Sequence, residues 1–398
     1  MLHGPLAGNL LFFTLPIALS SIVQQLFHAA DTAVVGYFGN ENALAAVGTN
    51  TEIIALIVTL SSGLSIGANI LVANQIGKKK TEELPAIAQT ALLLAFVIGA
   101  MGLLLGQLAA APLLRLIRTP DEIMDASVLY LRIYMAGYPF LLLYDFGTSV
   151  LRARGDSRSP FLALLLSGIG NVGLNLFFVT VCRMGVAGVA AATDISTAFS
   201  AGLVLHRLMR DDLFRLPFHG PSSVSRKIPG LLFLPAEHLQ IAGKILKNGI
   251  PSALQGAVFC FANIFVQASV NCFGATAIAG STIAMNFEYF TYYIITTFGQ
   301  TATTFTSQNH AAGQKDRCRR ILWLCLGLST VCSSVPIFTL VLCRDFFCGL
   351  FTTEAAVIAS ASVRILCILL FEPICNFYEI PAGVLRGSGH ALYPAIST

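Results

Sequence analysis

The sequence predicts an all-α integral membrane protein built from two pseudo-symmetric, parallel helix-bundle repeats. Its 398 residues are 55% hydrophobic and only 11% charged, with a mean hydropathy of +0.75. Soluble domains carry roughly 25% charged residues, so the shortage of charge indicates a membrane protein. Apolar runs of membrane-spanning length recur along the chain, and the pattern of its first part returns in its second.

Ten apolar runs are predicted to be complete spans, because a hydrocarbon core about 30 Å thick needs about 20 helical residues. Glycine and proline interrupt many of these runs, which transmembrane helices tolerate. Six spans are expected in each repeat, so the second repeat holds four complete spans and the start of a fifth. The predicted spans are residues 10–35, 46–76, 84–114, 126–151, 160–182, 185–207, 248–271, 277–305, 320–343 and 356–385.

The distribution of Lys and Arg predicts the orientation. Eighteen of the 24 basic residues fall on one side of these spans and six on the other, and the basic side stays in the cytoplasm. We therefore expect a multi-pass protein of the cell (cytoplasmic) membrane with a cytoplasmic N-terminus. The basic residues occupy short loops rather than one patch, so we expect no nucleic-acid partner.

The only long loop predicts the domain organisation. Residues 208–247 are Pro-rich and partly charged, which is typical of a linker. They would join an N-terminal six-helix lobe, residues 1–207, to a C-terminal lobe, residues 248–398, that holds helices 7–10 and the start of helix 11.

The two lobes share a sequence repeat. Residues 139–160 and 373–394 agree at seven of 22 positions with a constant offset of 234, and Asp145 pairs with Glu379 at the same offset. Internal repeats in a membrane protein indicate transport, with the site at the repeat interface. The identical pairs are Pro139/Pro373, Tyr144/Tyr378, Val150/Val384, Leu151/Leu385, Arg152/Arg386, Gly155/Gly389 and Pro160/Pro394.

The second repeat is expected to be shorter than the first. Pro160 opens the fifth helix, so Pro394 should open the eleventh, yet the sequence ends at Thr398. Relative to a full second repeat, about 40 residues are expected to be missing. A fragment, a truncated gene product and a degenerate paralogue stay open as explanations.

Three groups of residues resemble the MATE (multidrug and toxic compound extrusion) transporters of bacterial type. They lie in the first helix, in the loop between the fourth and fifth helices, and in the eighth helix, and the likeness extends over essentially the whole chain. The matching residues are Leu15-Pro16, Gln24-Gln25, Asp31-Thr32, Val35-Gly36 and Gly39, then Leu151-Arg152-Ala153, Gly155-Asp156 and Pro160, and finally Gly299-Gln300, Thr303-Thr304 and Gln308-Asn309.

The resemblance implies a function. Members of this family have two six-helix lobes arranged as a V, which exchange access between the two sides of the membrane. They export cationic, amphipathic compounds in exchange for H⁺ or Na⁺. The resemblance covers both lobes, but the eleventh and twelfth helices of the family are not expected to be complete in this sequence.

Asp31 is the most informative polar residue, because it is a carboxylate inside the first apolar run. A carboxylate at the bilayer centre costs at least ~2.5–3.5 kcal/mol, so an acid kept there indicates function. Its equivalent in the second repeat is Val266 or Gln267, depending on the offset. Asp31 is therefore expected to serve one lobe only.

The resemblance also implies a cation-coupling site in the first lobe. Family members use the helix-1 Asp, a helix-5 Asn followed four residues later by Asp, and a helix-6 Thr. Here Asp31, Asn171 and Thr193 match, whereas Asn175 replaces the helix-5 acid and Asp194 follows Thr193. We expect these five residues to form the site, with Asp31 as a Na⁺ ligand if Na⁺ is the coupling ion. Asp194 either restores the missing charge, after about one turn of adjustment, or is a structural hydrogen-bond partner.

Other polar residues are predicted to line a substrate cavity. Stripes on the first and seventh helices either face a cleft between the lobes or bond to neighbouring helices. A carboxylate among tyrosines suits an amphipathic cation, and the paired acids Asp145 and Glu379 are either contacts between helices or cavity lining. The predicted cavity residues are Gln24, Gln25, His28, Gln255, Asn263, Gln267, Glu288, Tyr292 and Glu379.

We expect a transporter rather than an enzyme, because the sequence contains no GxxxxGK[ST], HExxH or GxSxG motif. Without a nucleotide site, transport would be secondary: antiport of small cationic compounds against H⁺ or Na⁺, with no other cofactor. The expected partners are these compounds and the lipid bilayer, and the expected state is a monomer.

Two alternatives to antiport remain. A flippase for lipids or lipid-linked precursors generally needs a strongly basic cavity, whereas the basic residues here are predicted in loops. An inactive truncated paralogue would follow if the missing helices left the second lobe unsupported.

Overall fold

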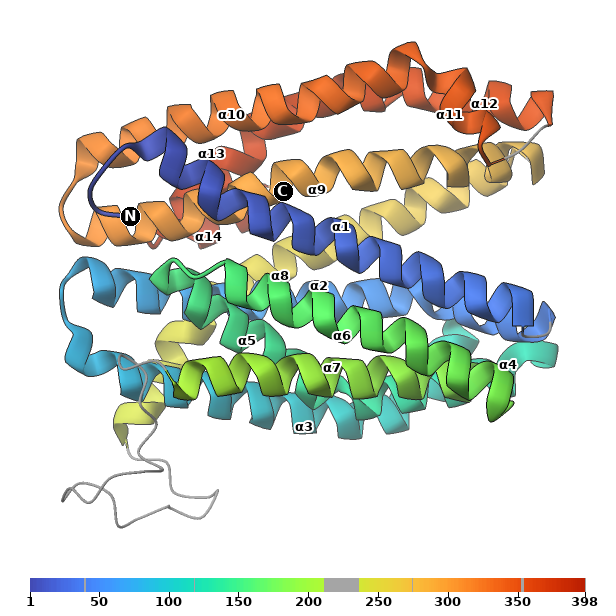
Figure 1. Ribbon diagram of the computed structural model, residues 1–398, viewed down its shortest axis with the longest axis horizontal. Helices are drawn as coiled ribbons and strands as arrows, with labels where there is room; N and C mark the ends of the chain where they lie inside the picture. Colours follow the sequence, from blue (N-terminus) through green and yellow to red (C-terminus); the bar gives the residue numbers. More distant parts are fainter. Residues whose placement is uncertain (39–40, 118, 211–235, 274, 352–353, 398) are drawn as a thin grey trace. The chain divides into compact units, whose positions relative to one another are not determined.

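A computed structural model describes residues 1–38, 41–117, 119–210, 236–273, 275–351 and 354–397 (Figure 1). Every regular element in these ranges is a helix, as the predicted fold class requires. The first repeat contains α1 (Leu6–Phe38), α2 (Glu41–Gly77), α3 (Leu84–Leu116), α4 (Asp121–Ala136), α5 (Tyr138–Arg154), α6 (Arg158–Leu176) and α7 (Val186–Met209). The second contains α8 (Ala236–Asn271), α9 (Ala275–Ala311), α10 (Lys315–Leu342), α11 (Arg344–Gly349), α12 (Ala355–Cys367), α13 (Asn376–Gly387) and α14 (Leu392–Ser397).

The described helices account for the ten predicted spans. Seven segments are long and apolar enough to cross a membrane, or eight if the pair of α4 and α5, which bends by 44°, is one span. The two remaining predicted spans coincide with α8 and α9, which have 36 and 37 residues.

Two predicted spans are broken rather than continuous. The span predicted at residues 126–151 breaks at Gly137, between α4 and α5. The span predicted at residues 356–385 passes from α12 through a 3-10 segment, Leu369–Cys375, into α13. Both breaks fall next to a proline, Pro139 or Pro373, whose missing N–H cannot continue the preceding helical ladder.

The structure confirms the repeat in its helix boundaries. Helices α9, α12 and α14 begin 234 residues after α2, α4 and α6, and α9 also ends 234 residues after α2. The equivalent glycines Gly155 and Gly389 both adopt left-handed backbone angles, with φ of 106° and 90°. Glycine takes up such angles without a steric penalty, so the same helix-ending turn is built twice.

The helices pack into two compact units. The first-repeat unit comprises Leu19–Gly256, and the second-repeat unit comprises Met1–Ala18 and Ala257–Thr398. The unit boundaries therefore fall inside α1 and α8. The N-terminal part of α1 belongs to the second-repeat unit, and the N-terminal part of α8 belongs to the first-repeat unit. The lobes predicted at residues 1–207 and 248–398 describe the sequence repeat, and their boundaries stay a prediction.

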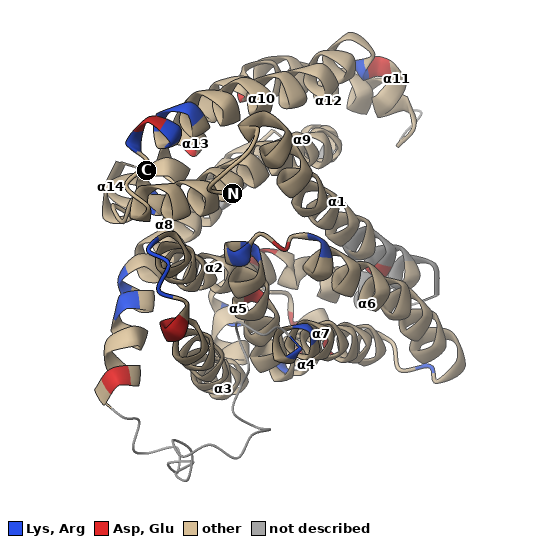
Figure 2. Cartoon of the chain, turned by 60° about the vertical axis from the view of Figure 1, so that its left-hand side comes forward, with Lys and Arg blue, Asp and Glu red and all other residues tan. Residues whose placement is uncertain are grey.

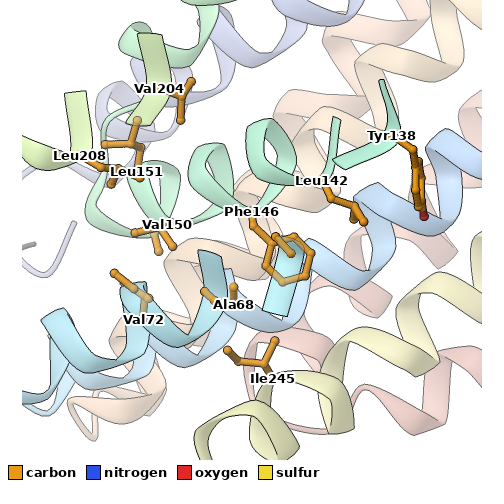
Figure 3. Close-up of a cluster of buried hydrophobic side chains, with 14 of the residues drawn as sticks. Ala68, Val72, Tyr138, Leu142, Phe146, Val150, Leu151, Val204, Leu208 and Ile245 are labelled. Carbon is orange, nitrogen blue, oxygen red and sulfur yellow. The ribbon is translucent and has the colours of Figure 1, made fainter. Parts of the chain in front are cut away.

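Glycine allows α8 to join the first-repeat unit. A Cβ added at Gly67 of α2 would lie 2.1 Å from the carbonyl oxygen of Ile245, and one at Gly63 would lie 2.4 Å from the Cα of Ala253. Figure 3 shows Ile245 of α8 beside Ala68 of α2, near Phe146 of α5. This close backbone approach is typical of small-residue packing between membrane helices.

The start of α1 joins the second-repeat unit through larger side chains. Leu10, Phe13 and Ile17 pack with Phe298 and Phe305 of α9 in one buried apolar cluster. The hydroxyl groups of Thr14 and Thr301 lie 2.9 Å apart within the same contact. In the first-repeat unit, Lys and Arg gather at helix ends and on the first turns of α8 (Figure 2).

Candidate functional site

Asp31 lies buried in the first-repeat unit, with 7% of its surface exposed. Asn175 of α6 donates a hydrogen bond from Nδ2 to Asp31 Oδ1. Nδ2 of Asn175 also donates to Asn171 Oδ1 at 3.0 Å. The two asparagines are one helical turn apart on the same buried face of α6, so Asn175 contacts Asp31 directly and Asn171 contacts Asn175.

The amide of Asn175 holds the carboxylate without neutralising it. Both hydrogen bonds use its Nδ2, while its Oδ1 is buried and has no hydrogen-bond partner among the described residues. Asp31 likewise forms no ion pair with a described residue. A buried amide oxygen without a donor, next to a carboxylate, is suited to coordinate a cation or to accept a hydrogen bond.

Thr193 and Asp194 are neighbours on α7 but face different groups. The Thr193 hydroxyl donates to the Val189 carbonyl at 3.0 Å and lies within hydrogen-bonding range of Asp31. Asp194 instead lies against Gly137, at the break between α4 and α5, and accepts its backbone N–H. Successive helical residues point about 100° apart, so the two side chains leave α7 in different directions.

Two tyrosines of α4 complete the surroundings of these acids and were not predicted. Tyr130 is buried and lies close enough to Asp31 and Asp194 to interact electrostatically with both. Tyr134, one turn further along α4, lies close enough to Asp194 to interact with it electrostatically. Their spacing of four residues places them on one helix face, a signal that was present in the sequence.

The oxygen-rich donor set fits a small hard cation. Asp31, Asn171, Asn175 and Thr193 offer carboxylate, amide and hydroxyl oxygens, the ligand types that such cations prefer. No group of three His, Cys, Asp or Glu residues that would hold a metal ion occurs within the described part of the chain. The described donor set therefore consists of one carboxylate and neutral oxygen ligands.

The second-repeat unit pairs two of its acids, Glu288 and Glu379, with arginines. Glu288 of α9 accepts two hydrogen bonds from Arg364 of α12, from Nε at 2.7 Å and from Nη2 at 2.9 Å. Arg364 Nη1 also donates to the Ser281 hydroxyl at 2.6 Å. Within α13, Arg386 Nη2 donates to Glu379 at 2.8 Å, and both side chains are at least 91% buried, with exposures of 8% and 9%.

Most basic residues were predicted in loops, with Arg364 just inside the helical span predicted at residues 356–385. Arg364 and Arg386 sit on helices among the acids they neutralise. The sequence had suggested Glu288 and Glu379 as cavity residues but had not identified a partner for Glu288. That partner is 76 residues away along the chain, so no local pattern indicates it.

Further polar contacts link the same helices. Glu372 accepts a hydrogen bond from Thr291 at 2.5 Å and is 7% exposed. The hydroxyl groups of Tyr292 and Tyr378 lie 3.1 Å apart. Tyr292 therefore bonds across to α13, which ties a predicted cavity residue to the helix that carries Glu379.

The other predicted cavity residues are distributed over both units. Gln24 and Gln25 are half-buried and Gln255 is buried in the first-repeat unit, whereas Asn263 is exposed in the second-repeat unit. The side chains of His28 and Gln267 lie outside the described part of the structure. The common cavity stays a prediction.

Comparisons with known proteins agree with this architecture. A probable multidrug resistance protein of Bacillus subtilis, YoeA, is 26% identical over 389 residues, which cover 96% of this chain and 82% of that protein. The probable multidrug resistance protein NorM of Thermotoga maritima is 25% identical over 404 residues, covering 98% and 82%. An FAD transporter of Shewanella oneidensis is 23% identical over 97% of this chain and 85% of that protein.

Solved structures share the fold. An outward-facing multidrug resistance MATE transporter superposes with a TM-score of 0.88 at 21% identity, covering 99% of this chain and 85% of that chain. A transporter from Pyrococcus furiosus, described as having a binding pocket of reversed polarity, gives a TM-score of 0.86 at 20% identity. The sequence profile of the MatE family matches residues 16–181 and 251–398. With most of its length matched, repeat by repeat, the chain belongs to the MatE family of membrane transporters.

Proposed function

We propose that the protein is a secondary active antiporter that exports cationic, amphipathic compounds in exchange for H⁺ or Na⁺, with Asp31 as the coupling carboxylate. The observation that carries this proposal is that Asp31 is buried and that its hydrogen-bond partners among the described residues, Asn175 and Thr193, are neutral. A buried carboxylate without a basic partner gains most from binding a proton or a cation.

The mechanism follows from mutual exclusion. When Asp31 is ionised, its negative charge stabilises the state that binds a cationic compound. When an ion enters from outside, the charge is neutralised, and the contacts of Asp31 with Asn175 and Thr193 change. An ion drives transport only if it binds the two access states with different affinities. Asn175 and Thr193 would give that difference, because they lie on α6 and α7 whereas Asp31 lies on α1.

The acids of the chain favour a cationic substrate. FAD carries a pyrophosphate, so a substrate like the one named for the Shewanella oneidensis relative would need basic groups free to bind it. Arg364 and Arg386 are instead paired with Glu288 and Glu379. The same argument weighs against the flippase alternative.

The test is gradient-driven efflux of ethidium from proteoliposomes. Asp31→Asn should abolish the gradient dependence, because an amide neither binds a proton nor carries the charge that holds Na⁺. Asp125→Asn, an exposed acid of α4, is the matched control and should behave like the wild type. Gradient-driven efflux retained in Asp31→Asn would refute the assignment. Imposing a Na⁺ gradient alone and a proton gradient alone identifies the ion.

A further inference from the structure

The ion pair of Glu288 and Arg364 differs from the other arginine pair of the second-repeat unit. Both oxygens of Glu288 are engaged by the fork of the guanidinium, and Ser281 holds a third nitrogen. Bidentate pairs of this kind are the strongest and most directional ion pairs in proteins. Yet the side chains of Arg364 and Glu288 remain 14% and 17% exposed, against 8% and 9% for Arg386 and Glu379.

A second acid lies beside this pair. Glu372 bonds to Thr291, three residues after Glu288 on α9, and lies close enough to Glu288 to interact with it electrostatically. The cluster thus holds two carboxylates and one guanidinium. Its formal charge is −1, whereas without Arg364 it would be −2.

Arg364 acts on Glu288 as a tethered cation. A cation on the same chain has a high effective concentration at its partner, so a free monovalent compound competes poorly for Glu288. In the low effective dielectric of a protein interior each added charge changes the interaction with a bound cation strongly. Glu372 is bonded to Thr291 and has no guanidinium partner among the described residues, so we expect it to set the number of positive charges that the cluster accepts.

We propose that Arg364 is a specificity-determining residue, which limits the second-repeat unit to compounds with a single cationic group by occupying Glu288. The proposal rests on the proposed export of cationic compounds. It predicts that removing the guanidinium opens a site for a second positive charge and changes the preference between mono- and dications.

Ethidium and propidium test the proposal, because they share one planar ring system and carry one and two positive charges. In proteoliposomes, Arg364→Met should raise the ratio of propidium efflux to ethidium efflux by about tenfold, since Glu288 becomes available to the second charge. Glu288→Gln should change the ratio in the opposite direction, because it leaves the guanidinium without its acid. Arg364→Lys, which keeps the charge, should resemble the wild type.

The controls separate selectivity from folding and from transport itself. The double variant Glu288→Gln/Arg364→Met removes both charges and should return the ratio to the wild-type value. Arg344→Gln, at a weak surface pair with Asp345 (3.9 Å), should not change it. An unchanged ratio in both Arg364→Met and Glu288→Gln, with ethidium still exported, overturns this proposal. A wild-type protein that exports neither dye contradicts the proposed function instead.

Discussion

Asp31 of the first repeat and the arginine-paired acids Glu288 and Glu379 of the second are held in opposite ways. In the first, Asp31 is held by the amide of Asn175, a neutral donor. In the second, Glu288 and Glu379 are held by the guanidinium groups of Arg364 and Arg386. An acid paired with arginine keeps its charge whatever the state of the transporter, whereas an acid held by amides can change its charge without leaving a basic group unpaired. This contrast supports the proposed coupling role of Asp31, and it indicates that Glu288 and Glu379 keep their charges paired.

Breaking the most deeply buried pair should have the largest effect on stability. Arg386→Met leaves the Glu379 carboxylate buried without its guanidinium, and removing one partner of such a pair costs about 3–5 kcal/mol. We expect a large fall in the unfolding midpoint in detergent. Glu379→Gln/Arg386→Met should recover most of the loss, because no charge is then left unpaired. A single variant as stable as the wild type would contradict a structural role for this pair.

Removing the neutral donor of the first repeat should cost less. Asn175→Ala removes the amide donor to Asp31 and leaves Thr193 as the other described donor, and an unsatisfied buried partner costs about 1–3 kcal/mol. Asn286→Ala, an exposed asparagine of α9 that bonds only to the carbonyl of Thr282 among the described contacts, is the control and should change stability by less than about 0.5 kcal/mol. If Asn175→Ala destabilised the protein as much as Arg386→Met, the distinction between the two repeats would fail.

Asp194 offers a third arrangement, an acid held by a backbone N–H. A Cβ added at Gly137 would lie 2.1 Å from Asp194 Oδ1, so Gly137→Ala should displace the carboxylate and cost about 1–3 kcal/mol. Gly170→Ala on α6, where a Cβ meets no atom within 4 Å, is the control and should be neutral or slightly stabilising. Gly137→Ala/Asp194→Ala should be more stable than Gly137→Ala alone. Equal stability of Gly137→Ala and the wild type would show that Asp194 does not hold the break.

The sequence predicted the fold well because its signals are local. Hydrophobic runs located the ten spans, and the offset of 234 that relates Gly155 to Gly389 also relates the helix boundaries. Within the site, the resemblance led to Asp31 and Asn175, which are 144 residues apart and meet in the structure. Residue types alone could not predict the partner of Glu288 or the direction of Asp194, because both depend on which helix faces meet. The contact of Asp194 with Gly137 explains the direction of the Asp194 side chain, but this contact exists only because α7 packs against the break between α4 and α5.

The loop after α5 gives the smallest contrast between the repeats. Asp156 accepts the backbone N–H of Ser159 at 3.0 Å and its hydroxyl at 2.6 Å, which holds the first turn of α6. The equivalent residue in the second repeat is His390, whose ring nitrogen lies 3.4 Å from the Ser388 hydroxyl and binds no amide of α14 among the described contacts. Losing a carboxylate that holds a helix N-terminus costs about 0.5–2 kcal/mol, so Asp156→Ala should lower the unfolding midpoint measurably. His390→Ala should leave it within about 0.5 kcal/mol of the wild type. Equal effects of the two substitutions would show that this loop, unlike the buried acids, has kept the same role in both repeats.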